Sequence, residues 1–318
     1  MKIFRHYEDV PNSCKGAVVA IGNFDGVHRG HQALIARAAA VAKAEGAPLG
    51  VLAFEPHPQE FFRPQNESFH LTPLRTKARL LAECGVQVLY ALPFDNSMSQ
   101  KGAEEFVRDV LVDGLGVRGV VVGADFRFGK GRSGDAAFLV EAGRRFGFAV
   151  EIFDTLIAHD TQKISSSEIR AALKGGKPEV AAKLLGHWWT IEARVEHGDA
   201  RGRELGFPTA NMALDGYLKP AFGIYAVRAT FLENEKPVGT YDGVASLGIR
   251  PMFKTDIPLL ESYLFDFSGD LYGKHLAVEL VAYLRPEMKF ESVDALKARM
   301  TKDSEAARAA LDRAGGGC

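Results

Sequence analysis

The chain has 318 residues, of which 47% are hydrophobic and 25% charged, close to the averages of globular proteins. This length suggests about two domains, each large enough to have its own core. Lys and Arg together number 39 against 40 Asp and Glu, so the charge balance does not favour a nucleic-acid partner.

Targeting segments and disulfides are not indicated by the sequence. Residues 1–10 lack the apolar core of a secretory signal, and no stretch of about 18 apolar residues could span a membrane. The three cysteines, Cys14, Cys84 and Cys318, form neither a metal-binding pattern nor an even set of disulfides. We therefore expect a cytoplasmic protein without membrane association, and the sequence does not indicate its oligomeric state.

The first informative stretch is an apolar run over 17–21, which predicts a buried strand. Gly22 and Gly26 then indicate a turn, and a helical pattern follows over 32–38. A loop that connects a parallel strand to a helix is where open α/β sheets bind their ligands.

Two histidines lie in this loop. His28 and His31 are three residues apart, so both rings are expected on one face of the first helical turn. Unpaired N–H groups at a helix N-terminus attract anions, and no Glu or Cys at a matching spacing offers a third metal ligand. The pair therefore favours a polyphosphate over a metal ion, although two incidental solvated histidines remain the alternative.

Strands and helices then alternate to about residue 153, which predicts a parallel sheet with right-handed crossovers and a Rossmann-like α/β fold. The dinucleotide fingerprint G-x-G-x-x-G is missing where such a fold would need it. The expected strands are 49–54, 86–92, 118–123 and 148–153, and the expected helices are 74–84, 102–112 and 135–146.

Three further segments follow strand ends in this half. Over 55–62, two prolines stiffen a loop that presents His57 and Phe62, or that simply covers the core. Over 123–129, aromatic residues between glycines suit either a flat ligand ring or a hairpin with buried phenylalanines. In that segment Arg127 is placed to meet a phosphate.

The third segment is 164–170. Ser165 and Glu168 have the spacing of a capping box, which is a purely structural explanation. The hydroxyls of Ser165 and Ser166, with the guanidinium of Arg170, suit β- and γ-phosphates equally well.

The pattern changes after residue 174. A Gly–Gly pair and Pro178 break the helix, a short helix is expected over 179–185, and Gly186 ends it, so we place a domain boundary near 186. Alternating strands without intervening helices then predict an antiparallel barrel, with a terminal helix over 293–311 packed on it. The expected strands are 190–197, 224–231, 260–267 and 276–284.

The polar chemistry of this half centres on 201–211, where glycines and arginines suit a mobile loop over phosphates. Thr209 and Asn211 are two residues apart, so on a strand they face the same way. Their oxygens suit Mg²⁺ that is otherwise bound by water and phosphate. The simpler alternative is that Thr209 and Asn211 are two polar residues on a solvent-facing side of the barrel. The same caution applies to Glu261, an acidic residue of a later expected strand, which could be an ordinary exposed carboxylate.

Whole motifs carry more information than these single residues. The block GNFDGVHRGH at 22–31 resembles the phosphate-binding signature GxFDGxHxGH of the nucleotidylyltransferase superfamily. The other three segments resemble the PHPxxxF, GxDFxFGxxxxG and ISSTxIR motifs of the FMN adenylyltransferase module of bacterial FAD synthetases, with Ser167 in place of the usual Thr.

This resemblance implies that His28 and His31 are catalytic and meet the triphosphate of ATP, and that Ser165, Ser166 and Arg170 clamp it. Further implied ATP-binding residues are Gly22, Asn23, Phe24, Asp25 and Gly30, and the implied flavin-binding residues are His57, Phe62, Asp125, Arg127 and Phe128.

The second half resembles riboflavin kinases through its match to GRxLGFPTAN at 202–211 and to LExHLLDF…DLYG from 260 onward. The resemblance implies that Glu261 is the general base for the ribityl 5′-hydroxyl and that Thr209 and Asn211 hold Mg²⁺. ATP would then contact Gly202, Arg203, Gly206 and Pro208. The departures from the family pattern are Ala193 for Gly, Ser246 for Asn, Met252 for Thr, and Ser262 and Tyr263 for Val and His.

Together the motifs imply a bifunctional flavin cofactor enzyme with an adenylyltransferase domain over 1–185 and a riboflavin kinase domain over 186–318. ATP, riboflavin and FMN would be its substrates, FAD and pyrophosphate its final products, and Mg²⁺ its metal. Two alternatives stay open: a nucleotidylyltransferase that acts on another phosphate acceptor, and a non-catalytic flavin or nucleotide sensor.

Overall fold

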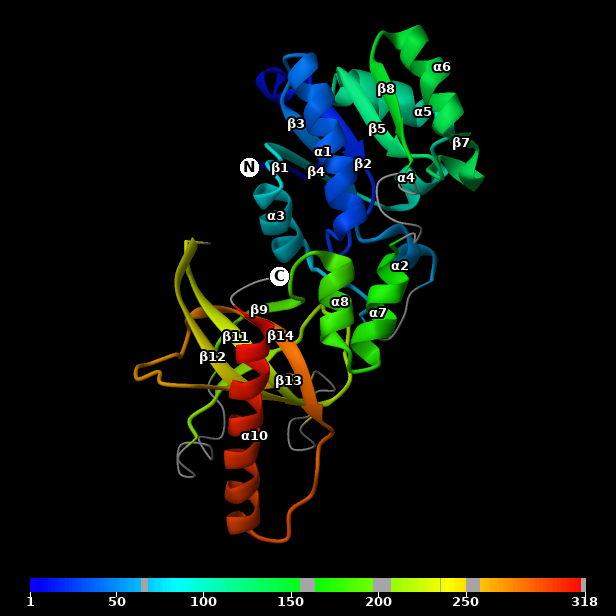
Figure 1. Ribbon diagram of the computed structural model, residues 1–318. Coiled ribbons are helices and arrows are strands. Elements are labelled where there is room, and N and C mark those ends of the chain that lie inside the picture. The colour runs from blue at the N-terminus through cyan, green and yellow to red at the C-terminus, as the bar shows by residue number, and fades with distance from the viewer. Residues whose placement is uncertain (64–67, 155–163, 197–206, 235, 250–257, 316–318) are drawn as a thin grey trace. The chain divides into compact units, whose positions relative to one another are not determined.

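The computed structural model describes residues 1–63, 68–154, 164–196, 207–234, 236–249 and 258–315. The chain forms two compact units (Figure 1). The first contains Met1–Asn66 and Leu74–Ile164, and the second contains Glu67–Pro73 and Ser165–Cys318.

The first unit is built on a parallel six-stranded sheet with the order β1-β4-β3-β2-β5-β8. This confirms the predicted Rossmann-like α/β domain. Strand β1 was not predicted, because its three residues are mostly exposed and carry no apolar pattern. The strands are β1 (Lys2–Phe4), β2 (Val18–Ile21), β3 (Leu49–Glu55), β4 (Val88–Pro93), β5 (Gly119–Gly123) and β8 (Ala149–Phe153).

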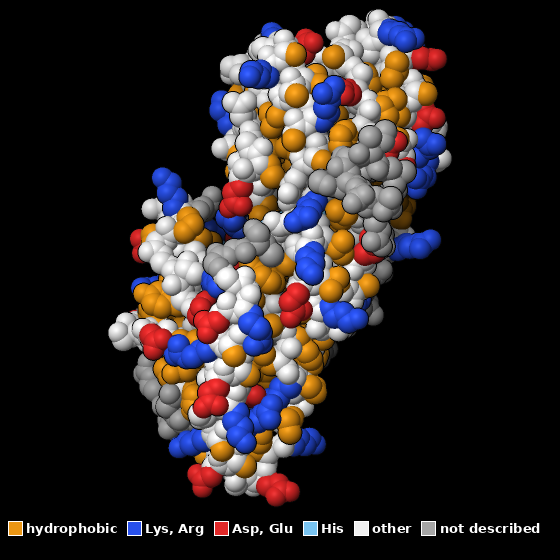
Figure 2. Space-filling model, in the orientation of Figure 1, with side chains coloured by type: hydrophobic (Ala, Val, Ile, Leu, Met, Phe, Trp, Pro, Cys, Tyr) orange, Lys and Arg blue, Asp and Glu red, His pale blue; other side chains and the backbone are white. Residues whose placement is uncertain are grey.

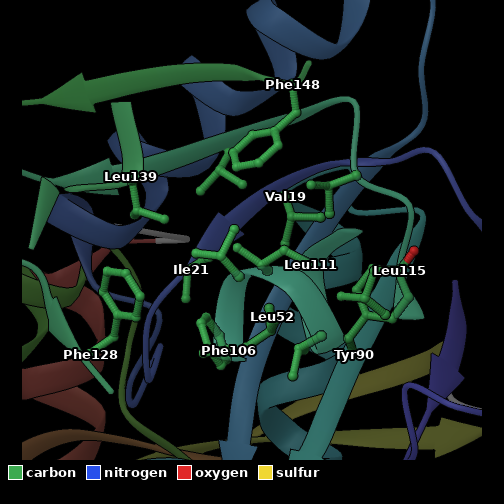
Figure 3. Close-up of a cluster of buried hydrophobic side chains, with 14 of the residues drawn as sticks. Val19, Ile21, Leu52, Tyr90, Phe106, Leu111, Leu115, Phe128, Leu139 and Phe148 are labelled. Atoms are coloured by element: carbon green, nitrogen blue, oxygen red, sulfur yellow. The ribbon is translucent and has the colours of Figure 1, made fainter. Parts of the chain in front are cut away.

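Helices cover both faces of this sheet, so all four residues of β2 are buried. Val18 and Ala20 face a core shared with α1 (Arg29–Ala44) and α3 (Leu74–Glu83). Val19 and Ile21 face the opposite core, shown in Figure 3, which includes the π-helix η2 (Phe106–Gly114) and α6 (Ala136–Phe146). The shorter elements are η1 (Asn12–Cys14), α2 (Pro58–Phe62), α4 (Asn96–Gln100), α5 (Ala103–Glu105), β6 (Arg127–Phe128), η3 (Lys130–Arg132) and β7 (Gly134–Asp135).

The second unit contains an antiparallel six-stranded sheet with the order β10-β13-β12-β11-β14-β9. An isolated bridge joins Glu196, two residues after the end of β9, to Asn211 of β10, so the barrel is nearly closed, as predicted. The strands are β9 (Thr190–Arg194), β10 (Ala210–Ala213), β11 (Gly223–Glu233), β12 (Lys236–Gly248), β13 (Leu259–Leu264) and β14 (His275–Arg285).

Strand β12 is the longest strand of the barrel and was not predicted. Its sequence contains a proline and three glycines, which have low strand propensity, so local pattern alone did not indicate it. It is held by pairing with β11 on one side and β13 on the other.

The terminal helix α10 (Val293–Ala314) packs on the barrel, as predicted. Ala307 and Leu311 meet Ala226 and Val281 of the strands in a small buried cluster. Charged side chains of both signs lie interspersed on the visible surface of α10 (Figure 2). Two shorter helices, α7 (Ser166–Lys174) and α8 (Pro178–Leu185), precede the barrel.

A segment from the first half of the sequence belongs to the second unit. The indole Nε1 of Trp189 donates to the carbonyl of Leu71 at 2.8 Å, and Leu218 N donates to the carbonyl of His70 at 2.7 Å. Both contacts are non-local, so no motif indicates them. The predicted division of the chain at residue 186 stays a prediction.

Candidate active sites

The histidine pair of the first unit lies at the start of α1. His28 is the N-cap, and its Nδ1 accepts a hydrogen bond from the backbone N–H of His31 at 3.3 Å. The two rings stack with centroids 3.6 Å apart and planes at 16°. The spacing of three residues therefore brings both rings together at the helix N-terminus, as expected.

His31 is the more strongly perturbed member of this pair. Its ring packs against fully buried Phe24 at 5.1 Å, and its buried Nδ1 has no hydrogen-bond partner among the described residues. Burial, then the neighbouring His28 and Lys77, lower the pKa of His31 well below its ordinary value. A neutral ring with an unpartnered nitrogen beside a helix N-terminus suits a ligand oxygen.

The other residues of the loop keep room for these rings. A Cβ at Gly30 would lie 3.2 Å from the His28 ring, and one at Gly22 would lie 3.2 Å from the Phe24 ring. Asp25 is buried and Asn23 is half-buried. Because the Phe24 side chain is fully buried, its predicted contact with ATP would have to be made by the backbone.

Of the predicted flavin residues of the proline loop, His57 is half-buried and Phe62 is exposed. His57 is the N-cap of α2, where its Nδ1 accepts from the backbone N–H of Gln59 at 3.0 Å. Phe62 is 64% exposed and meets Phe61 and Phe94 edge to face, with centroids 5.2 and 5.6 Å away. An exposed ring on an aromatic support offers an apolar surface to a flat ligand.

In the glycine-rich segment, Asp125 and Arg127 are exposed, whereas Phe128 is buried against Phe106 at 5.4 Å. Phe126 is half-buried and stacks on Phe128 at 5.5 Å. Of the two phenylalanines, Phe126 thus has the more accessible ring, and sequence reasoning did not single it out. The assignment of Phe128 to the flavin stays a prediction.

Aromatic contacts connect the two segments that were assigned to the flavin. They run from Phe62 through Phe94, Phe54 and Phe106 to Phe128, with successive centroids 5.3 to 6.3 Å apart. These residues are far apart in sequence, so only the fold brings them together.

The predicted phosphate clamp lies in the second unit. Ser165 forms the capping box of α7: its Oγ accepts from Glu168 N at 3.3 Å, and its N–H donates to Glu168 Oε2 at 3.2 Å. Arg170 donates from Nε to the carbonyl of Phe69 at 2.8 Å. Ser165 and Arg170 thus have structural roles, and Ser166 is half-buried. The contact of all three with phosphate stays a prediction.

The barrel site centres on Glu261 of β13. Glu261 lies directly opposite Asn211 on β10 and directly opposite Ser246 on β12. Directly paired residues of antiparallel strands point to the same face, so the three side chains share one face of the sheet. A cavity of about 440 Å³ opens here, and Thr209, Ser246 and Glu261 line it.

The cavity has an apolar wall that motif reasoning did not assign. Phe207 and Tyr263 meet edge to face at 5.1 Å on one side. Other apolar lining residues come from the segment after β14 and from α10, namely Met288, Phe290, Leu296 and Met300. The sequence predicted only a helix over 293–311 packed on the barrel, because the surface that α10 covers is decided by packing.

Charged groups hold this wall in place. Arg285 makes hydrogen bonds to buried Asp303 of α10 from Nε at 2.9 Å and from Nη2 at 2.6 Å. Glu287 also lines the cavity, and burial, together with the charge of Glu261, raises the pKa of its carboxyl.

Several predicted kinase residues fall elsewhere. Pro208 is exposed beside the cavity residues Phe207 and Thr209. Of the departures from the family pattern, Ser246 lies in the cavity and Ala193 lies on β9 opposite Leu276. Gly202, Arg203, Gly206 and Met252 lie outside the described residues.

The donor atoms near Glu261 suit one kind of metal. Within the described ranges, no group of three or more His, Cys, Asp or Glu side chains could hold a metal ion. The hydroxyl of Thr209 and the amide oxygen of buried Asn211 fit Mg²⁺ that takes its other ligands from phosphate and water.

A parallel α/β domain with paired imidazoles at a helix N-terminus, joined to a barrel with a carboxylate in its cavity, defines a class of two-domain nucleotidyl- and phosphoryl-transferases. The FAD synthetase family model matches residues 10–168, and the riboflavin kinase family model matches residues 185–311. The chain belongs to the bifunctional riboflavin kinase/FMN adenylyltransferase family, which confirms the predicted family.

Relatives match along almost the whole chain. The bifunctional riboflavin kinase/FMN adenylyltransferase of Escherichia coli K12 is 41% identical over 309 residues, 97% of each chain. That of Listeria monocytogenes is 40% identical over 297 residues, 92% of this chain and 91% of the relative.

A crystal structure described as a macrolide-efflux protein from Streptococcus pneumoniae superposes with a TM-score of 0.83 and 31% identity, over 96% of this chain and 98% of that one. None of the helices in the described ranges is long and apolar enough to cross a membrane.

Proposed function

We propose that residues 186–318 phosphorylate riboflavin with ATP to give FMN, and that residues 1–185 transfer the adenylyl group of a second ATP to FMN. The supporting observation is that the FAD synthetase family model matches residues 10–168 and the riboflavin kinase family model matches residues 185–311 of the same chain. The barrel match weighs against a nucleotidylyltransferase for another acceptor, which would not need Thr209, Asn211 and Glu261.

In the kinase step, Glu261 accepts the proton of the ribityl 5′-hydroxyl, and the freed oxygen attacks the γ-phosphorus of ATP. The bond between that phosphorus and the β–γ bridging oxygen breaks, and ADP leaves. Thr209 and Asn211 would hold Mg²⁺, which would neutralise phosphate charge. The apolar wall of the cavity binds the flavin ring and excludes water.

In the adenylyl-transfer step, a phosphate oxygen of FMN attacks the α-phosphorus of ATP and displaces pyrophosphate. The chain provides no nucleophile, and FMN and ATP are aligned by the loop at 22–31. Neutral His31 and its stacked partner His28 donate hydrogen bonds to the phosphate oxygens as charge develops. His57, Phe62, Asp125 and Arg127 hold the flavin.

ATP, riboflavin and FMN are the partners in this proposal, without nucleic acid or membrane. The described cysteines, Cys14 and Cys84, are free thiols, which fits a reducing cytoplasm.

The direct test is incubation of the protein with riboflavin, ATP and MgCl₂, with the products separated by chromatography. We expect FMN first and then FAD. One ADP should form for each riboflavin consumed, and one pyrophosphate for each FAD formed. Absence of both FMN and FAD would overturn the proposal. Tight flavin binding without turnover would instead support the sensor alternative, and omission of MgCl₂ tests the metal requirement.

A further inference from the structure

Lys77 of α3 is a buried cation that neither proposed reaction uses. Its side chain is 1% exposed, and it is the one lysine among the buried described residues. In the part of the chain that the structure describes, its single hydrogen bond is to Glu55 Oε2, at the long distance of 3.5 Å. An ammonium has three donors, so this desolvated charge is poorly satisfied.

The position of Lys77 relates it to the histidine loop. Glu55 is the last residue of β3, which pairs with β2 so that Leu52 lies opposite Ile21. Gly22, the first residue of the loop, donates its N–H to the carbonyl of Leu52 at 3.1 Å. The Lys77 ammonium, which contacts Glu55, is therefore at the carboxyl-terminal end of the parallel strands, the end from which the loop leaves the sheet.

Two further observations place Lys77 on the side of the imidazoles. Helix α3 packs on the same face of the sheet as α1, the helix that begins after His28. The positive charge of Lys77 is also one of the causes that lower the pKa of His31. A buried cation with unused donors beside a polyanion site matches a phosphate ligand.

We propose that the Lys77 ammonium binds the phosphate chain of ATP during adenylyl transfer, and binds pyrophosphate in the reverse reaction. This inference rests on the proposed adenylyl transfer. As the FMN oxygen bonds to the α-phosphorus, the bond to the α–β bridging oxygen breaks and pyrophosphate takes the electron pair. Lys77 stabilises that negative charge, no proton is exchanged, and neutral His31 remains a hydrogen-bond donor.

The competing explanation is that Lys77 only forms a structural pair with Glu55. Three variants separate the two roles. Lys77→Gln removes the charge, Lys77→Arg keeps it, and Glu55→Gln removes the charge of the partner but keeps an acceptor for Lys77. If the pair is purely structural, Lys77→Gln and Glu55→Gln will have equal effects.

The experiment uses the full-length chain and measures ATP-dependent FAD formation, pyrophosphate-dependent FAD breakdown, and riboflavin phosphorylation. We expect Lys77→Gln to lower kcat/KM for ATP about 10- to 100-fold and to raise the KM for pyrophosphate in the same range. Lys77→Arg should recover part of this loss, and Glu55→Gln should stay within about threefold of wild type. Riboflavin phosphorylation, which takes place in the other unit, should be unchanged in all three variants.

A second readout is the proton NMR titration of His31. Loss of the neighbouring charge should raise the pKa of His31 in Lys77→Gln and not in Lys77→Arg. Unchanged constants for ATP and pyrophosphate in Lys77→Gln, or equal losses in Lys77→Gln and Glu55→Gln, would overturn the inference. If wild type itself forms no FAD, it is the proposed function that fails.

Discussion

The imidazole rings of His28 and His31 stack with their centroids 3.6 Å apart, and His28 caps the helix on which His31 lies. Two positive charges at this distance would repel strongly, so the pair is suited to neutral hydrogen bonding. The capping bond from His31 N to His28 Nδ1 also fixes the orientation of the first ring.

Replacement of His28 by alanine should therefore remove both a phosphate donor and the cap. We expect FAD formation to fall about 100- to 1,000-fold while FMN accumulates, because the kinase site is separate. Chromatography of the flavins checks this. His6→Ala, at an exposed histidine, is the matched control and should leave both steps unchanged. Loss of both activities in His28→Ala would contradict independent sites.

The lowered pKa of His31 predicts how the stability of the first unit depends on pH. Below about pH 6.5 the unfolded chain takes up a proton at His31 that the folded chain does not, so stability falls as the pH falls. The loss attributable to His31 approaches about 1.4 kcal/mol per pH unit.

Amide hydrogen exchange in β2 and β5 at pH 7.5 and 5.5 measures this loss. His31→Gln should show a smaller decrease in protection over the same interval. Equal decreases in the two proteins would mean that His31 is not the responsible group.

Glu261 is expected to be essential for phosphorylation alone. Glu261→Gln keeps the size of the side chain but not its basicity, so FMN formation should drop about 100- to 10,000-fold. Added FMN should still be converted to FAD. Glu233→Gln, at an exposed position in the same barrel, is the control for a change of charge. Normal FMN formation by Glu261→Gln would rule out the general base.

The ion pair that fixes α10 to the barrel should be costly to break from one side. In Asp303→Asn, Arg285 keeps its charge in a site where its side chain is only 10% exposed, so we expect destabilisation by about 3–5 kcal/mol. Asp266→Asn breaks a second ion pair of α10, the one between Asp266 and Arg308. Because the Asp266 side chain is 81% exposed, this change should cost at most about 1 kcal/mol.

Trp188 and Trp189 are the only tryptophans of the chain, so urea unfolding followed by their fluorescence reports on the second unit. Because Asp303 lines the cavity, the KM for riboflavin should also rise in Asp303→Asn and not in Asp266→Asn. Equal free energies of unfolding of the two variants would show that the buried ion pair contributes no more to stability than the exposed one.

At Ser262 we expect a substitution to stabilise the protein, in contrast to Asp303→Asn. It is fully buried, and its hydroxyl has no hydrogen-bond partner in the described part of the chain. Removal of this hydroxyl in Ser262→Ala should stabilise the second unit by about 1 kcal/mol, measured by the same unfolding experiment. A clear loss of stability would indicate that the hydroxyl is in fact satisfied.

Much of the fold follows from local pattern. The buried run at 17–21, the strand–helix alternation and the later alternating strands predicted a parallel α/β domain and an antiparallel barrel, and both are confirmed. The three-residue spacing of His28 and His31 predicted a shared face, since the helix repeat is a local property. The motifs predicted the family for the same reason, because each is a short contiguous stretch.

Only the tertiary structure decided the rest. The apolar wall from α10, the burial of Lys77 against Glu55, and the attachment of Leu71 to Trp189 join residues distant in sequence. Helical periodicity states that one face is apolar but not which surface it covers. That choice depends on the shape and the free energy of packing between elements, and a linear pattern does not contain it.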